Sequence, residues 1–224
     1  MPITAIAWKE SCKGLKNVSH GKKVGIEGQW HMFNGLWQVK CASITNLYRE
    51  SKEVSQARVR LRVILSWLPN SPLREFILSI FNDKNILEKF IIAPGSISHH
   101  HNYRGGLLVH SAETAWQVFN NQQLQPDDRH FGAVIALLHD IGKIWSYSSN
   151  KAITELGSYV DHELLTLEVL APHLNWLDHV DAQLAIAIRY SLVWKKKSYD
   201  SIPKMDVIEV LKSADRLSAG SSLI

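Results

Sequence analysis

The feature that most constrains this chain is an adjacent histidine and aspartate, His139 and Asp140, directly after the apolar run 131–138. Such a run at the end of a periodic segment predicts a buried helix. Removing water from a carboxylate is costly unless the charge is paired or bound to a cation. The doublet therefore needs a partner from elsewhere in the chain, and a divalent metal ion is one candidate.

Two other predicted helices carry a side chain of the ligand type. The segment 106–121 places His110 on an apolar stripe, and the segment 203–219 places Asp215 beside an apolar face. Taken singly, His110 is more simply read as a hydrogen-bonded core residue and Asp215 as a solvated edge residue. Taken with the doublet, one metal ion would satisfy all four side chains.

Two imidazoles and two carboxylates leave open positions on a six-coordinate ion. This set suits manganese, iron, nickel, cobalt or magnesium better than a closed structural zinc site. Water on such an ion is acidified, so phosphoester hydrolysis is the expected reaction, with Asp140 orienting the water. Lys143 follows the doublet and is the expected partner of the phosphate charge, although a lysine there is also a favourable helix-dipole partner.

The order of these motifs resembles a known family. The local sequences GGLLVHSAETA, LLHDIGK and SADRL resemble the HD-domain metal-dependent phosphohydrolases. The phrase HHHNYRGGLLVH at residues 99–110 is closer still to the YhaM-type 3′-to-5′ exoribonucleases. The resemblance implies a helical HD domain and an enzyme acting on single-stranded nucleic acid. It also places His101 and Tyr103 at the mouth of the active site, where we expect them to contact substrate.

Family members that hold two ions supply further histidines on the next two helices. His162 fits the first of these positions, but it also fits a helix-capping or surface histidine. On the second helix Arg189 stands where the family has histidines. We therefore expect one ion, or a weak second site at Asp140 and His162, with Arg189 contacting a substrate phosphate. In the run 99–101, successive side chains of an extended segment would point to opposite sides, so we do not expect His99 to contact substrate.

The N-terminal part, residues 1–54, is predicted to be a small β module. The segments 3–8, 22–30 and 32–40 resemble the latter half of an OB-fold, and Asn34-Gly35 predicts a hairpin turn. The resemblance requires two earlier strands, so we expect a partial barrel with open edges. Such edges are covered or paired, and we expect residues 1–48 to pack on the helical domain or to join a second copy in a homo-oligomer.

The remaining part, residues 55–224, is predicted to be the helical metal-binding domain, so the fold class is mainly α with a small β module. With 224 residues, 46% of them hydrophobic, the chain can bury one sizeable core. Hydrophobic periodicity predicts helices over residues 55–67, 72–82, 85–90, 106–121, 126–141, 159–170, 178–191 and 203–219.

Charge and targeting signals add weaker constraints. A net charge of +4 and the triplet at residues 195–197 are compatible with nucleic-acid binding, although a lysine triplet is more often a solvated loop. No long apolar run or signal peptide is evident, so we expect a cytoplasmic protein without membrane contact and with reduced thiols, although a disulfide between Cys12 and Cys41 stays open.

Three functions remain open from the sequence. The first is a nuclease-type phosphodiesterase, in which Trp30, Phe33 and Trp37 stack on bases, although strand aromatics more often serve as core. The second is a phosphohydrolase of small nucleotides, which needs no stacking surface. The third is a non-catalytic nucleic-acid-binding module, because HHHNYRGG also resembles the HD-type domain of conjugative relaxases.

Overall fold

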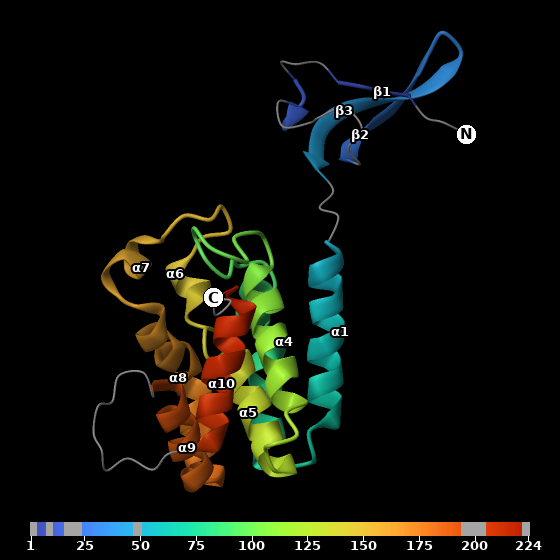
Figure 1. Cartoon of the computed structure of the whole chain (residues 1–224). Helices are drawn as coiled ribbons and strands as arrows, with labels where there is room; N and C mark the ends of the chain where they lie inside the picture. The colour runs from blue at the N-terminus through green and yellow to red at the C-terminus, as the bar shows by residue number, and fades with distance from the viewer. Residues whose placement is uncertain (1–3, 8–10, 16–23, 47–50, 194–204, 221–224) are drawn as a thin grey trace. The chain divides into compact units, whose positions relative to one another are not determined.

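The computed structural model describes residues 4–7, 11–15, 24–46, 51–193 and 205–220 (Figure 1). It is mainly helical with a small three-stranded sheet near the N-terminus, which confirms the predicted fold class at this level. The chain divides into two compact units, residues 1–50 and 51–224. No helix in the described ranges is long and apolar enough to cross a lipid bilayer.

The N-terminal unit contains β1 (Thr4–Ile6), β2 (Val24–Phe33) and β3 (Leu36–Asn46) in the order β1-β3-β2. The central strand β3 is parallel to β1 and antiparallel to β2. Asn34 and Gly35 join β2 to β3 with φ angles of 49° and 75°, which confirms the predicted Asn-Gly hairpin.

The surface of this hairpin is rich in apolar side chains. Met32 pairs with Trp37 across the strands, and Trp30 lies two residues before Met32, so these three share one face of the sheet. All three are more than half exposed. Phe33 is also exposed, so the aromatic side chains of the hairpin do not form a core within the described residues. Cys12 and Cys41 are buried in this unit as free thiols.

The second unit is a bundle of helices. Its first helix begins at Lys52, where Ser51 caps it by accepting a hydrogen bond from the Val54 amide. The helices are α1 (Lys52–Trp67), α2 (Pro72–Asn82), α3 (Lys84–Phe90), α4 (Gly106–Phe119), α5 (Pro126–Leu138), α6 (Lys143–Ser146), α7 (Glu155–Tyr159), α8 (His162–Val180), α9 (Ala182–Val193) and α10 (Asp206–Ser218).

Helices α4 and α5 form the centre of the bundle. Helix α5 begins with Pro126, whose missing N–H is not needed in a first turn, and with two aspartates that favour the positive end of the helix dipole. Every residue from Phe131 to Leu138 is buried. Burial on all sides explains why the sequence between these two residues is apolar without interruption.

Helix α8 differs from its prediction. The sequence predicted an end at residue 170, before Pro172, but the helix continues through this proline to Val180. A proline inside a helix removes one hydrogen bond. Leu174 and Leu177 lie beyond it and are buried in the core, and their burial offsets that loss.

Two short helices, α6 and α7, were not predicted. Figure 1 shows them at the end of the helical unit where α4 begins. Each is shorter than two turns, too short for hydrophobic periodicity to reveal. The lysine triplet at 195–197 and the predicted start of the last helix at 203 lie outside the described residues.

Candidate metal centre

The glycine pair before α4 determines where this helix begins. Gly105 precedes the helix with a φ of 85°, a conformation that favours glycine. Gly106 packs so closely on the backbone of His101 and Gly95 that a Cβ would collide with both. The loop 95–101 is thereby held against the start of α4, and His110 follows one turn later with 3% of its surface exposed.

The His139-Asp140 doublet lies at the end of α5. His139 is the C-cap residue, and its Nδ1 lies 2.8 Å from the carbonyl oxygen of Ala136. A carbonyl oxygen only accepts, so Nδ1 carries a proton, and in the neutral imidazole Nε2 keeps its lone pair for another partner. Asp140 follows with 4% of its surface exposed.

The side chains from three helices converge on one point. His110 Nε2 lies 3.4 Å from Asp140 Oδ2 and 3.1 Å from Asp215 Oδ1. His139 Nε2 lies 3.4 Å from each of the same two oxygens, and 3.3 Å from His110 Nε2. The structure therefore brings together all four residues that the sequence singled out from the predicted helices.

This geometry suits a cation. Adjacent ligand atoms around an octahedral ion at a bond length of about 2.1 Å are about 3 Å apart. The donor atoms of His110, His139 and Asp140 lie within 4.8 Å of one another, so this group could hold a metal ion. Asp215 Oδ1 is close enough to both imidazoles to share it. One divalent ion would therefore satisfy the facing nitrogen and oxygen atoms of His110, His139 and Asp140 together.

His162 and Lys143 approach the same carboxylate from different sides. His162 is the first residue of α8, and its Nε2 lies 3.2 Å from Asp140 Oδ1. The Lys143 ammonium lies 2.6 Å from Asp140 Oδ2 and 2.7 Å from the carbonyl oxygen of Gly95. Asp140 is thus the centre of the cluster, with each of its oxygens facing a different set of partners.

The turn between Asp140 and α6 depends on Gly142. A Cβ at this position would collide with the carbonyl oxygen of His162 and the amide nitrogen of Thr166. The Gly142 amide also donates to Thr166 Oγ1 over 3.0 Å. The glycine after the doublet therefore lets the first turn of α8 approach, which is how His162 reaches Asp140.

The cluster shifts the protonation of its members. Burial disfavours the charged form of His110, but hydrogen bonds with Asp140 and Asp215 outweigh it and raise the pKa of His110 to about 9. Burial also opposes ionisation of Asp140, yet the charges of His139 and Lys143 hold its pKa well below the ordinary range. At Asp215 hydrogen bonds from both histidines likewise overcome burial and lower the pKa. Without a cation the cluster holds a proton instead.

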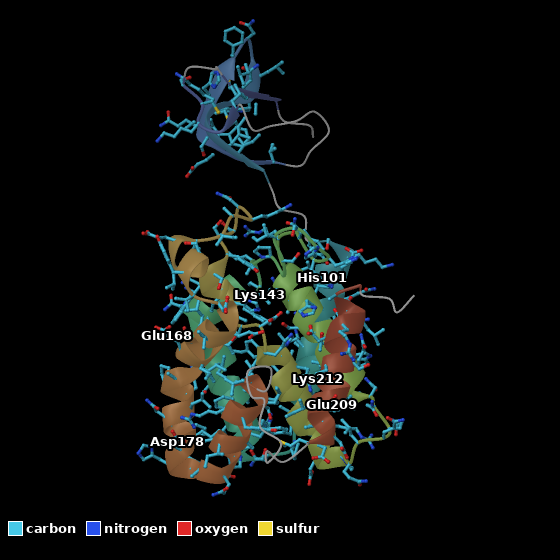
Figure 2. The ribbon with its side chains drawn as sticks, turned by 60° about the vertical axis from the view of Figure 1, so that its left-hand side comes forward. His101, Lys143, Glu168, Asp178, Glu209 and Lys212 are labelled. Atoms are coloured by element: carbon cyan, nitrogen blue, oxygen red, sulfur yellow. The ribbon has the colours of Figure 1, made fainter. Side chains whose placement is uncertain are left out.

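A pocket of about 210 Å³ opens over the cluster. It is lined by His110, Asp140, Lys143, His162 and Asp215, together with the loop residues Gly95, Ser96, His99, His100 and His101 and with Ala219 at the end of α10. Figure 2 shows His101 and Lys143 at the same end of the helical unit. The pocket gives a small ligand access to the carboxylates.

All three consecutive histidines line this pocket, contrary to the expectation that His99 would face away. The segment is not extended. Ser96 Oγ donates to the His100 carbonyl over 2.8 Å and accepts from the His99 amide over 3.1 Å, and His101 has a φ of 62°. This tight loop turns the three side chains to one side, and the sequence signal for it was Ser96 in front of the run.

Tyr103 is not among the described residues that line the pocket. Its hydroxyl lies 3.4 Å from His101 Nδ1, and His101 does line the pocket. The contact of Tyr103 with substrate stays a prediction.

Arg189 lies elsewhere. Its guanidinium, on α9, donates two hydrogen bonds of 2.7 Å to the Asp178 carboxylate on α8. Figure 2 shows Asp178 near one end of the helical unit and Lys143 near the other. Arg189 is not among the described residues that line the pocket over the cluster, so the structure does not bring it together with the four predicted ligand residues.

The sequence analysis did not single out two residues next to this cluster, Ser218, which contacts His110, and Glu113, which contacts Ser218. Each follows a ligand residue by three positions on the same helix, His110 on α4 and Asp215 on α10. This i, i+3 spacing on a shared helix face was the signal that could have found them.

Comparisons with family models, with curated proteins and with solved structures find no match to this chain. What the chain does must therefore be argued from the chemistry of the His110, His139, Asp140 and Asp215 cluster.

Proposed function

We propose that this protein is a metal-dependent phosphohydrolase that cleaves phosphodiester bonds, with single-stranded nucleic acid as its substrate. The observation that carries the proposal is the convergence of His110, His139, Asp140 and Asp215 beneath an open pocket. A closed, fully satisfied cluster would point to a structural ion, whereas an open one leaves room for water and substrate.

The four residues would hold one divalent ion of the manganese, iron, nickel, cobalt or magnesium type. Such an ion, when bound, acidifies a water molecule and polarises a phosphoryl oxygen. Asp140 has a second oxygen, Oδ1, that can orient this water, and His162 at 3.2 Å holds that oxygen in place. Asp140 and His162 are also the residues that a weaker second ion would use.

Lys143 supplies positive charge on the pocket wall. The side chain of Lys143 is 12% exposed, and the residue lines the pocket. Its ammonium can therefore stabilise the charge that develops on a phosphate. The positive charges of a divalent ion and of the Lys143 ammonium exceed the negative charges of the Asp140 and Asp215 carboxylates by one. This balance favours an anionic substrate over a neutral one.

A nucleic-acid substrate is supported by three features. The motifs resemble the HD superfamily and its YhaM-type exoribonucleases. The chain carries a net charge of +4. The β unit presents Trp30, Phe33 and Trp37 to solvent, and base stacking on such side chains contributes about 1–3 kcal/mol each in proteins that bind single strands.

The test combines metal analysis with a substrate panel. Elemental analysis of the purified protein is expected to find a transition metal or magnesium, and Asp140→Ala is expected to lose it. Asp178→Ala removes an exposed carboxylate at the other end of the helical unit and serves as the matched control, with unchanged metal content. Equal metal content in wild type and Asp140→Ala would refute the site, and hydrolysis retained by Asp140→Ala would refute the mechanism.

The substrate panel separates the remaining functions. Single-stranded RNA, single-stranded DNA and nucleoside phosphates are each incubated with the protein and manganese. Release of nucleotides from the polymers supports the proposal. Turnover of nucleoside phosphates alone would replace it with a small-nucleotide phosphohydrolase, and binding of polymer without hydrolysis under any divalent ion would replace it with a non-catalytic binding module.

A further inference from the structure

Helices α4 and α10 each carry a polar side chain one turn beyond a ligand residue. On α4 this is Glu113, after His110, and on α10 it is Ser218, after Asp215. Both side chains are part-buried, and they contact each other across the two helices. None of the chemistry proposed above uses them.

The side chains of His110, Ser218 and Glu113 form a chain of hydrogen bonds. His110 Nδ1 lies 3.1 Å from Ser218 Oγ, and Ser218 Oγ lies 3.1 Å from Glu113 Oε2. At the outer end, Arg60 from α1 places its Nη1 3.7 Å from Glu113 Oε1.

The direction of each hydrogen bond follows by elimination. An ionised carboxylate has no proton to donate, so the single hydroxyl proton of Ser218 goes to Glu113. Ser218 Oγ must then accept from His110, so Nδ1 of His110 carries a proton. In the neutral form of this imidazole, the form that can bind a metal ion, the lone pair is therefore on Nε2, the nitrogen that faces Asp140 and Asp215.

The position of Ser218 is fixed a second time. His101 Nε2 lies 2.9 Å from the carbonyl oxygen of Ser218, and this oxygen can only accept. His101 therefore holds the backbone at the end of α10 while Glu113 holds the side chain. The serine hydroxyl is thus aimed at His110 by contacts from two other elements.

We propose that Ser218 and Glu113 are positioning residues that lock His110 in its Nδ1–H form and so present Nε2 to the metal ion. This inference depends on the metal centre proposed above. The second imidazole, His139, is fixed in the same form by a backbone acceptor, the carbonyl oxygen of Ala136. One ligand histidine is therefore oriented by the main chain, the other by a serine and a carboxylate.

The effect of Ser218 and Glu113 on metal binding by His110 can be measured as the affinity of the protein for zinc, without an assay of turnover. Removing an orienting partner of a ligand histidine typically costs 10- to 100-fold in metal affinity. Ser218→Ala is expected to weaken zinc binding by about this factor, measured by competition with a chelating dye at constant pH. Ser218→Thr keeps the hydroxyl and is expected to restore the affinity, whereas Glu113→Gln removes the charge and is expected to lie between the two.

Two controls accompany these variants. Ser213→Ala and Glu209→Gln change the same residue types at exposed positions of α10 and are expected to leave the affinity unchanged. Thermal unfolding of every variant checks that the fold is intact. A Ser218→Ala affinity equal to that of wild type, or no rescue by Ser218→Thr, would overturn the inference.

Nitrogen-15 NMR of the wild-type protein shows directly which nitrogen of His110 carries the proton, and it needs no variant. In the zinc-loaded protein, labelled at histidine, His110 is expected to show a protonated Nδ1 and a metal-bound Nε2. A metal-bound Nδ1 would overturn the inference but leave the metal centre standing. A wild-type protein that binds no divalent ion at all would overturn the proposed function and this inference together.

Discussion

The ammonium of Lys143 lies 2.6 Å from Asp140 Oδ2, the same oxygen that faces the imidazoles of His110 and His139. The lysine and the proposed metal ion would therefore compete for one carboxylate oxygen. With that ion in place, the ammonium would turn toward the phosphate of the proposed substrate.

Replacing Lys143 by methionine separates these two roles. Lys143→Met keeps the length of the side chain but removes its charge, so turnover is expected to fall by about 100-fold, as for loss of one transition-state donor. Metal affinity is expected to stay the same or to rise, because a competitor for Asp140 is gone. Lys212→Met, on the surface of α10, is the control and leaves both quantities unchanged. A Lys143→Met enzyme that turns over at the wild-type rate would contradict the assigned role.

The raised pKa of His110 predicts how metal binding depends on pH. This pKa is raised from 6.5 to about 9, so below pH 9 the metal-free site carries a proton that the ion must displace. Affinity is therefore expected to rise with pH toward 9, by at most tenfold per unit for one displaced proton, and then to level off. Calorimetry at several pH values measures this slope, and a flat profile between pH 6.5 and 9 would contradict it.

Gly142→Ala is expected to damage the site through packing. The added methyl group would collide with the backbone of His162 and Thr166, and overpacking of this kind costs about 1–3 kcal/mol of unfolding free energy. Thr166→Val removes the hydroxyl that accepts from the Gly142 amide and donates to the His162 carbonyl, without adding bulk, and is expected to cost about 1 kcal/mol. Denaturant unfolding measures both, and a Gly142→Ala protein as stable as wild type would show that the close approach of α8 is not required.

Arg189→Ala is expected to leave catalysis unchanged. Its guanidinium pairs with Asp178 on the surface, and an exposed ion pair of this kind contributes little to stability. The kcat/KM of Arg189→Ala is expected to stay within about twofold of wild type, a free-energy change below 1 kcal/mol. A loss of tenfold or more would place this arginine at the substrate after all.

The β unit is expected to mediate self-association. Its outer strands β1 and β2 each pair with β3 on one side, and Trp30, Met32 and Trp37 form an exposed apolar face. Size-exclusion chromatography with light scattering is expected to find a dimer or larger species, and Trp37→Ser to shift it toward the monomer. Trp176→Ser, on the exposed face of α8, is the control. A wild-type monomer would contradict this expectation.

The sequence allowed the central helices and the four converging residues to be predicted, because these depend on local patterns. Helix α2 has the predicted bounds, and α4 and α5 begin at the predicted residues. Burial on an apolar stripe is a strong periodic signal, and a ligand residue on such a stripe must point inward. The His110, His139, Asp140 and Asp215 cluster follows from three such stripes.

The errors arose where contacts between distant segments decide the outcome. The three histidines at 99–101 share one side because Ser96 and Gly106 hold their loop in a tight turn, and no local periodicity encodes that turn. The contact of Arg189 with a substrate phosphate was expected from the resemblance alone. No pattern in the sequence indicated its ion pair with Asp178, which lies on the extension of α8 to Val180.

The pocket combines two kinds of scaffold. The side chains that would bind a cation come from helices and from the turn after α5, whereas most of the other residues that line the pocket come from the short loop 95–101. The loop is anchored at both ends, by the Gly95 amide on the His101 carbonyl and by Gly106. We expect exchange of residues between these anchors, in evolution or in the laboratory, to change which ligands the pocket accepts while the cluster of His110, His139, Asp140 and Asp215 stays in place.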